Sequence, residues 1–530
     1  MHQCLQVVEI VSLVCEEIEK RSLPSFARVC KAFNDPALDV LWRHQDSLGN
    51  ILRCMPAGIW EELYDADEDE ITWLMNRPVL LSDWERPLVY AHRVKSFNYD
   101  GRFPYPVSGR PTSAGFLKSL ELCFPWKPFK LFPNLQTLSF FSRSEGTFEY
   151  IRLFLGPQIN DLYLARPQTA AHLSLLQTIA AECPLLKDLE IQYPNQELDY
   201  KATFSALVLE LDRLESIILP CLDNFALEHL ARLPGLKSLT LENQTVMNSF
   251  SAGISDDIIF PSLQTLHITG EVVEAIFPLL TLMTHAPLRD LDIGIAETVT
   301  AKRLAALYSA IIRYCRTSYT SLERMNYCHG LGVGTAIPSH TDIPTYLVQG
   351  SQILSLAPFR NLSVVFLTAP LGFDLDDAIV GDLAQTWQHI CELSIYSTFY
   401  VNHPSRITLK GLLSFAQHCP HLRSLALPLD ATISTPASEA DANAGRRIQQ
   451  NSLLCMIVMR SPIADPLLVA DFLSSVFPKL NSILTDKTFH DPEADGPGDD
   501  VIEAIAYNEK WKAVAAALPV LRSIRTEERT

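Results

Sequence analysis

Few combinations of side chains in this 530-residue sequence could do chemistry. Gly330–Gly334 (GLGVG) suggests a phosphate cradle, but it lacks the spacing of a dinucleotide fingerprint and the Lys-Ser/Thr of a P-loop, so we interpret it as a loop. Cys419 lies between His418 and His421, as a nucleophile or metal ligand would, yet it occupies the position that Cys183 fills in a repeated phrase. We interpret Cys419 as a packing residue. We predict no catalytic, cofactor-binding or metal-binding residues. We therefore expect that the chain is not an enzyme and needs no cofactor.

The repeated phrase is a small or aromatic residue, often with a proline next to it, and then Leu-x-x-Leu-x-Leu or a close variant. Its alternating apolar residues predict short strands with one buried face. Its recurrence predicts stacked copies of one unit, because a single copy cannot bury its apolar side alone. Such an array usually binds partners rather than doing chemistry. The phrase occurs at Phe132–Phe140, Cys183–Ile191, Leu233–Leu241, Phe260–Ile268, Cys419–Leu427 and, in a degenerate form, Phe477–Leu484.

Helical patterns fill the intervals between these strands, for example at Ala170–Glu182, Ala301–Arg313 and Leu409–His418. Alternation of strand and helix predicts a parallel sheet with the helices on its outer side. We therefore predict an α/β fold for residues 111–530: an irregular leucine-rich-repeat-like solenoid with a curved parallel sheet and helices on the convex side. Leu117–Leu122 would supply its first strand, and Trp511–Ile524 would form a C-terminal cap.

The same phrase predicts which side chains face outward. The leucines point inward, so the residues that separate and flank the last two apolar positions point to the opposite, concave face. These residues are polar and many are acidic, which favours a basic partner protein. The predicted binding residues of this face are Asp188, Glu190, Glu242, His267, Asp290, Asp292 and Glu392.

Composition narrows the classes of partner and the compartment. The 43 basic and 61 acidic residues give a net charge of −18, which would repel a nucleic-acid backbone, so no nucleic-acid partner is predicted. No stretch of about 18 continuous apolar residues is present, so no membrane span is predicted. The 12 cysteines are scattered, and no signal peptide precedes the first helix. Both observations favour a reducing intracellular compartment, cytoplasmic and/or nuclear.

The first fifty residues differ from the rest. Apolar periodicity predicts three helices, at Val7–Ile18, at Leu23–Phe33 and after Asn34–Pro36. Three short helices cannot enclose a self-sufficient core, so the module 1–50 is expected to lean on another surface. Residues 51–110 are predicted to form a helical linker, with an acidic loop at Tyr64–Glu70.

The segment Leu5–Trp42 resembles an F-box, the module that docks substrate receptors onto the Skp1 adaptor of cullin-based ubiquitin ligases. The matching residues are Leu5, Val8, Glu9 and Ile10, the block Leu23–Phe33, and Asp35–Arg43; the usual Leu-Pro opening is Leu5-Gln6 here. Pro36–Gln45 and Leu81–Val94 resemble large sets of F-box proteins from mushroom-forming fungi. The resemblance implies an SCF-type substrate receptor whose repeats bind a protein substrate. The residues it implies for binding Skp1, and through it cullin, are Leu5, Val8, Ile10, Leu23, Phe26, Val29, Phe33, Leu38, Leu41 and Trp42.

Two alternatives stay open. The departure at Gln6 is compatible with a stand-alone repeat scaffold that binds a protein without any ubiquitin-ligase role, its first helices acting only as a cap. A separate interpretation of Phe26, Phe33 and Trp42 is that they form an intramolecular core against the linker helices. An enzyme is a third hypothesis, and it would need a constellation assembled from distant repeats.

Overall fold

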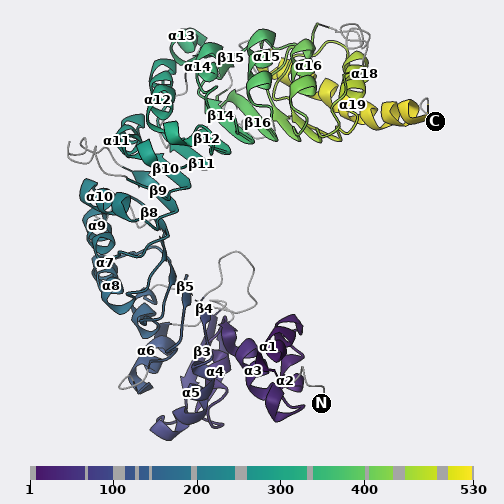
Figure 1. Ribbon diagram of the computed structural model, residues 1–530. Helices are drawn as coiled ribbons and strands as arrows, with labels where there is room; N and C mark the ends of the chain where they lie inside the picture. Colours follow the sequence, from purple (N-terminus) through teal and green to yellow (C-terminus); the bar gives the residue numbers. More distant parts are fainter. Residues whose placement is uncertain are drawn as a thin grey trace. The chain divides into compact units, whose positions relative to one another are not determined.

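The chain falls into two compact units, Met1–Leu236 and Lys237–Thr530. In each unit, strands of a parallel sheet alternate with helices (Figure 1). Among the residues described, the strands of the main parallel sheet number fifteen, six in the first unit and nine in the second. The predicted α/β class with a parallel sheet is therefore confirmed. The computed structural model describes residues 7–65, 70–99, 114–125, 130–141, 146–192, 200–244, 259–330, 338, 340–399, 405–433, 448–485 and 499–527.

The first unit begins with three helices, α1 (Val8–Glu17), α2 (Leu23–Phe26) and α3 (Lys31–Arg43). The predicted boundary at Asn34–Pro36 is wrong, because α3 runs through Pro36 and the break comes earlier, after α2. Pro36 removes one hydrogen-bond donor from the helix. However, Phe33, Pro36 and Ala37 are all buried on one side of α3, and this packing holds the helix together across the proline.

The segment that was predicted as a helical linker contains strands as well as helices. Its helices are α4 (Gly49–Leu52), a 3-10 turn η2 (Leu81–Trp84) and α5 (Glu85–Ala91). An antiparallel hairpin pairs β2 (Trp60–Asp65) with β3 (Glu70–Met75), so the ends of the predicted acidic loop are strand residues, while 66–69 lie outside the described residues. A short strand β1 (His44–Gln45) pairs in parallel with β4 (Ser96–Tyr99). The parallel sheet therefore begins before residue 111.

The predicted first strand at Leu117–Leu122 is wrong, because this segment lies in helix α6 (Ala114–Cys123). Phe116, Leu117 and Leu120 are buried together at helical spacing, whereas Leu122 is 80% exposed. A strand would have placed Leu120 and Leu122 on the same face.

The sheet of the first unit has the strand order β1-β4-β5-β6-β7-β8. The later strands are β5 (Thr137–Phe140), β6 (Asp161–Leu164), β7 (Asp188–Ile191) and β8 (Ser216–Leu219). Their buried residues lie opposite one another in the order Leu138, Leu162, Leu189 and Ile217. The intervening helices are η3 (Phe148–Leu153), α7 (Ala170–Leu176), α8 (Ile179–Glu182), α9 (Lys201–Leu209) and α10 (Asn224–Arg232).

The second unit contributes nine strands to the parallel sheet. Its strands are β9 (Ser238–Gln244), β10 (Thr265–Gly270), β11 (Asp290–Ile295), β12 (Arg324–His329), β14 (Val364–Ala369), β16 (Glu392–Ser397), β17 (Ser424–Ala426), β18 (Cys455–Ile457) and β19 (Ser482–Leu484), in that order. A separate parallel pair joins β13 (Val348–Gln349) to β15 (Phe373–Asp374).

Helices of the second unit lie on one side of its sheet (Figure 1). The helical elements are η5 (Val273–Ala275), α11 (Phe277–Thr281), η6 (Leu282–His285), α12 (Ala301–Tyr314), η7 (Arg316–Ser318), η8 (His340–Asp342), α13 (Ile343–Tyr346), α14 (Gly350–Leu354), α15 (Asp377–Thr386), α16 (Leu409–His418), α18 (Pro466–Val476) and α19 (Asp499–Glu527). The helices predicted at Ala301–Arg313 and Leu409–His418 are thus confirmed, and Ala170–Glu182 is helical with a break between α7 and α8. Thr300 and Thr408 cap α12 and α16 with their hydroxyl groups.

A leucine or isoleucine that precedes most strands of the main sheet is buried in the core. Full burial of one such side chain stabilises the fold by about 1.5–3 kcal/mol. At most 1% of each of these side chains is exposed: Leu135, Ile159, Leu186, Leu214, Leu236, Leu263, Leu288, Leu322, Leu362, Ile390, Leu422, Leu453 and Leu480.

The C-terminal helix α19 covers the end of the second unit. Trp511, Val514 and Leu518 are at most 2% exposed, and the Trp511 indole donates a hydrogen bond of 2.8 Å to the Ser461 carbonyl oxygen. The segment Trp511–Ile524, for which a C-terminal cap is predicted, lies within this helix. Along the described part of the chain, no helix is both long and apolar enough to cross a membrane.

Candidate interaction surfaces

The three N-terminal helices build a small core of their own. Leu23 is 1% exposed and Phe33 is 6% exposed, so these two predicted Skp1-binding side chains point into the module rather than outward. Phe26 is half-buried and stacks on Phe33, with ring centroids 4.6 Å apart. The core consists of Val11, Cys15, Leu23, Ala27, Phe33 and Ala37, with Ile18, Phe26, Cys30, Val40 and Leu41 packed against it.

Helix α3 also attaches the module to the segment that follows. Trp42 is half-buried and stacks on Tyr90 of α5, with ring centroids 4.7 Å apart. Arg93 forms an ion pair of 2.7 Å with Asp35 and a second, close one with Asp39. Of the remaining predicted anchors on α3, Leu38 and Leu41 are half-buried.

A second set of apolar side chains on this module faces solvent. Val8, Ile10 and Val29, all predicted to bind Skp1, are 60%, 38% and 66% exposed. Exposed apolar side chains mark an interaction site when they form a patch, and six such side chains are exposed among the described residues of this module. Leu5, also predicted, lies outside the described residues. The neighbouring exposed residues that the prediction did not include are Val7, Leu13 and Val14.

In the first unit, two carboxyl groups meet on the exposed face of the sheet. Asp161 of β6 and Asp188 of β7 lie opposite each other in register, and their carboxyl groups are in hydrogen-bonding contact. Burial, this contact and the negative charge of Asp161 raise the pKa of Asp188 to about 6. Thr137 donates a hydrogen bond of 2.7 Å to Asp161. Glu190 is half-buried on the same face, two residues after Asp188.

In the second unit, the corresponding acids are partly paired with bases. Asp290 accepts a hydrogen bond of 3.0 Å from Arg324 and lies 3.7 Å from Nε2 of His267. The interaction with Asp290 raises the pKa of His267, and the same interaction lowers the pKa of Asp290. Asp292 is hydrogen-bonded to Asn326 on the neighbouring strand, and burial raises the pKa of Asp292. The structure thus brings His267, Asp290 and Asp292 together. The positive charge of Arg324 offsets part of the negative charge of this group.

The remaining predicted substrate-binding residues are more isolated. Glu242 on β9 and Glu392 on β16 are exposed, on opposite sides of the group around Asp290 in the strand order. Between that group and Glu392, Phe366 of β14 packs edge-on against Tyr396 of β16, with ring centroids 5.5 Å apart. This aromatic pair is half-buried, and the prediction missed it because its strand carries valines and aromatic residues in place of the leucine phrase.

A comparison with protein-family models gives no match, and a comparison with curated proteins gives none either. The function is therefore argued from the surfaces themselves.

Cys419, one of the residues that suggested chemistry, is a packing residue in the structure. Cys419 is fully buried, its thiol lies 3.5 Å from the Ala384 carbonyl oxygen, and burial raises its pKa to about 12. A thiol with this pKa stays protonated and is a poor nucleophile, so the packing interpretation is confirmed. Gly330 follows β12, whereas 331–334 lie outside the described residues. Within the described segments, no cluster of three or more His, Cys, Asp or Glu could hold a metal ion.

Proposed function

We propose that this chain is the substrate-recognition subunit of an SCF-type ubiquitin ligase. In this proposal α1–α3 are an F-box that docks on the Skp1 adaptor and, through it, on cullin. The strand–helix units are a leucine-rich-repeat-like solenoid that holds a protein substrate. The chain itself supplies no chemistry: it brings the substrate close to a conjugating enzyme, and proximity alone lowers a reaction barrier by several kcal/mol.

The observation that carries the proposal is the apolar exposed surface of the N-terminal module. Val8, Ile10 and Val29 are exposed although the module already has a complete core from other residues. Such side chains gain free energy when a partner covers them, at about 25 cal/mol per Å² of apolar area. The half-buried Phe26, Leu38, Leu41 and Trp42 would border the contact, whereas Leu23 and Phe33 would support it from inside.

The substrate is proposed to be a basic protein that binds the strand face. The carboxyl groups around Asp188 in the first unit support this proposal more strongly than those around Asp290, because Arg324 already pairs with Asp290. A substrate receptor of this kind would work inside the cell, in the cytoplasm and/or the nucleus.

Binding to purified Skp1 tests the docking surface. We expect Val29→Asp and Ile10→Asp each to weaken binding at least about tenfold, because each places a charge against an apolar partner. Leu122→Asp is the matched control, since Leu122 is an equally apolar, 80% exposed residue on α6. Circular dichroism would verify that each variant is folded. Full binding by folded Ile10→Asp and Val29→Asp proteins would reject this surface, and no binding by the unmodified protein would reject the ligase role.

A stand-alone scaffold remains the second candidate. The observation that favours it is the attachment of α3 to the rest of the first unit through Trp42–Tyr90 and Arg93–Asp35, as expected of a cap. The same experiment separates the two functions, because a cap has no affinity for Skp1.

A further inference from the structure

A groove lies between α11 and α12 on the helix side of the second unit. It has a volume of about 750 Å³ and is open to solvent. This volume is within the range of ligand sites, about 300–1,000 Å³. The groove is lined by Phe277, Pro278 and Thr281 of α11 and by Ala306, Ser309, Ala310, Arg313 and Tyr314 of α12.

The spacing of the α12 residues explains why the groove exists. Ala306, Ser309, Ala310 and Arg313 follow one another at helical intervals and so form one face of α12. The opposite face, which includes Leu304, Leu307 and Ile311, is buried in the core. The side chains at the centre of this face of α12 are small, and they leave a space between α12 and α11.

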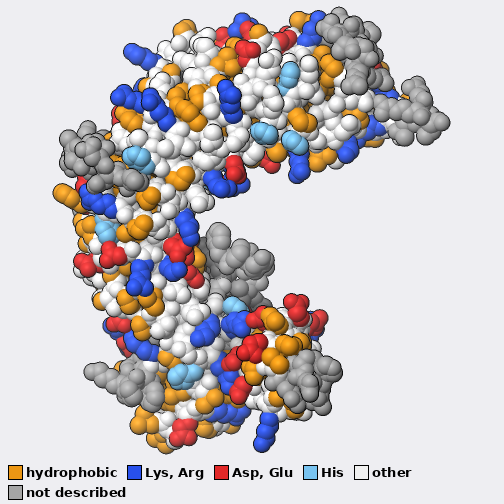
Figure 2. Space-filling model, in the orientation of Figure 1, with side chains coloured by type: hydrophobic (Ala, Val, Ile, Leu, Met, Phe, Trp, Pro, Cys, Tyr) orange, Lys and Arg blue, Asp and Glu red, His pale blue; other side chains and the backbone are white. Residues whose placement is uncertain are grey.

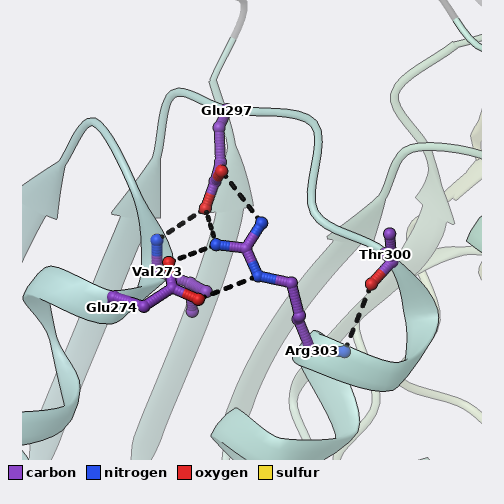
Figure 3. A network of polar contacts seen from close by, with 5 residues as sticks. All are labelled: Val273, Glu274, Glu297, Thr300 and Arg303. Carbon is purple, nitrogen blue, oxygen red and sulfur yellow. Dashed lines mark hydrogen bonds and ion pairs between the residues drawn. The ribbon is translucent and has the colours of Figure 1, made fainter.

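An ion-pair network fixes the two walls of the groove. Arg303, in the first turn of α12, reaches Glu297 in the preceding loop and Glu274 in η5, directly before α11 (Figure 3). Its Nη2 atom lies 2.7 Å from Glu297, whose carboxylate also accepts a hydrogen bond of 2.7 Å from the Val273 backbone amide. The groove is therefore held open before any partner arrives, which reduces the entropic cost of binding.

The charge of this wall is opposite to that of the whole chain. Helix α12 contains no Asp or Glu, in a protein with a net charge of −18. Its exposed cations include Lys302 and Arg313, and Lys and Arg side chains gather over α12 in Figure 2. Arg313 lies over the Tyr314 ring at 5.3 Å from its centroid, and no ion pair joins Arg313 to any residue that the structure describes.

We propose that this groove docks an amphipathic helix of a partner protein, with apolar side chains in the hollow and an Asp or Glu against Arg313. A helix suits a groove between two helices, since its apolar side chains at helical spacing enter from one face. An acidic side chain suits Arg313, because a guanidinium forms two parallel hydrogen bonds with a carboxylate. The site is on the helix side, away from the strand face that is proposed to bind a basic substrate, and it does not depend on the ligase proposal.

Selection of short helical peptides from a display library by the full-length protein tests the proposal. Ser309→Trp, used for counter-selection, fills the groove at an exposed position and leaves the buried face of α12 unchanged. We expect peptides that Ser309→Trp fails to bind, with apolar residues at helical spacing and at least one Asp or Glu. Fluorescence anisotropy should then show that Arg313→Glu lowers the affinity for these peptides at least about tenfold. Changing the acidic residue of the peptide to Lys should restore binding to the Arg313→Glu protein.

Lys302→Glu is the matched control, because it reverses an exposed charge on the same helix outside the groove lining. It should change the affinity less than Arg313→Glu does. Three results would overturn the proposal: no peptide that depends on Ser309, selected peptides that are basic, or equal effects of Lys302→Glu and Arg313→Glu. A small organic acid that co-purifies with the unmodified protein but not with the Ser309→Trp protein would also overturn the proposal, because it would indicate a metabolite site.

Discussion

The side chains of Asp161 and Asp188 meet across two neighbouring strands, and Thr137 donates a hydrogen bond to the first of them. Two carboxylates this close repel each other when both are ionised, so the pKa of Asp188 is raised and its proton is lost at a higher pH. This arrangement makes the stability of the first unit depend on pH.

Asp188→Asn should stabilise the protein at neutral and alkaline pH. The pKa of Asp188 is about 6 in the folded chain, above the value of about 3.9 in an unfolded chain, so the folded state binds the proton more tightly. The favourable contribution is complete below the unfolded pKa and is lost as the pH rises through 6. We expect a gain of about 1 kcal/mol at about pH 8, after discounting for solvent screening, and a smaller gain at about pH 5. Urea unfolding at the two pH values would measure this difference, with Glu210→Gln on an exposed helix end as the control.

Removal of the Trp42 indole should loosen the N-terminal module. Trp42→Ala removes a stacked ring from Tyr90 and leaves part of α5 uncovered, for an expected loss of about 2–3 kcal/mol. A double-mutant cycle with Tyr90→Ala should give a coupling energy of about 1 kcal/mol. Additive losses, measured by denaturant unfolding, would show that the two rings do not support each other.

Asp290→Asn should lower the pKa of His267. The carboxylate of Asp290 favours the protonated imidazole, so its contribution to stability is complete below the unfolded pKa of His267 and is lost as the pH rises through the folded value. The pKa of Asp290 is lowered, so its own contribution disappears when the pH falls through that pKa. An NMR titration of the His267 ring would detect the change. Glu392→Gln, an exposed acid on β16, should leave the titration unaltered.

Arg303→Ala should destabilise the second unit by about 2 kcal/mol, because it removes charge-assisted hydrogen bonds to two carboxylates and leaves these acids close together. Arg313→Ala, on the same helix, should cost less than about 0.5 kcal/mol. Thermal unfolding of the two variants would compare them directly. Equal losses would mean that the contacts in Figure 3 contribute little.

The strand phrase made most of the sheet predictable. Alternation of apolar residues is a local property, so the strands at Thr137–Phe140, Asp188–Ile191 and Thr265–Gly270 followed directly from the sequence. β4 was missed because it carries Phe97 and Tyr99 in place of leucines. Leu117–Leu122 misled the prediction because short apolar runs fit both a strand and a helix.

The polar surface was predictable only in part. Alternation indicated that His267, Asp290 and Asp292 face outward, but the ion pairs among them depend on which residues lie opposite in neighbouring strands. That register places Arg324 beside Asp290 and Asp161 beside Asp188, and no local pattern reports it. The exposure of Val8 and Val29, against the burial of Leu23, likewise depends on how three helices pack.

Helix α19 has one more consequence. β19 is the last strand of the sheet, its Leu484 is 49% exposed, and α19 packs against both α18 and β19. An uncovered terminal strand offers free amide and carbonyl groups to any other chain. A protein truncated before Asp499 would therefore expose the edge of β19 to other copies of the chain. We therefore expect the C-terminal helix to limit self-association through β19.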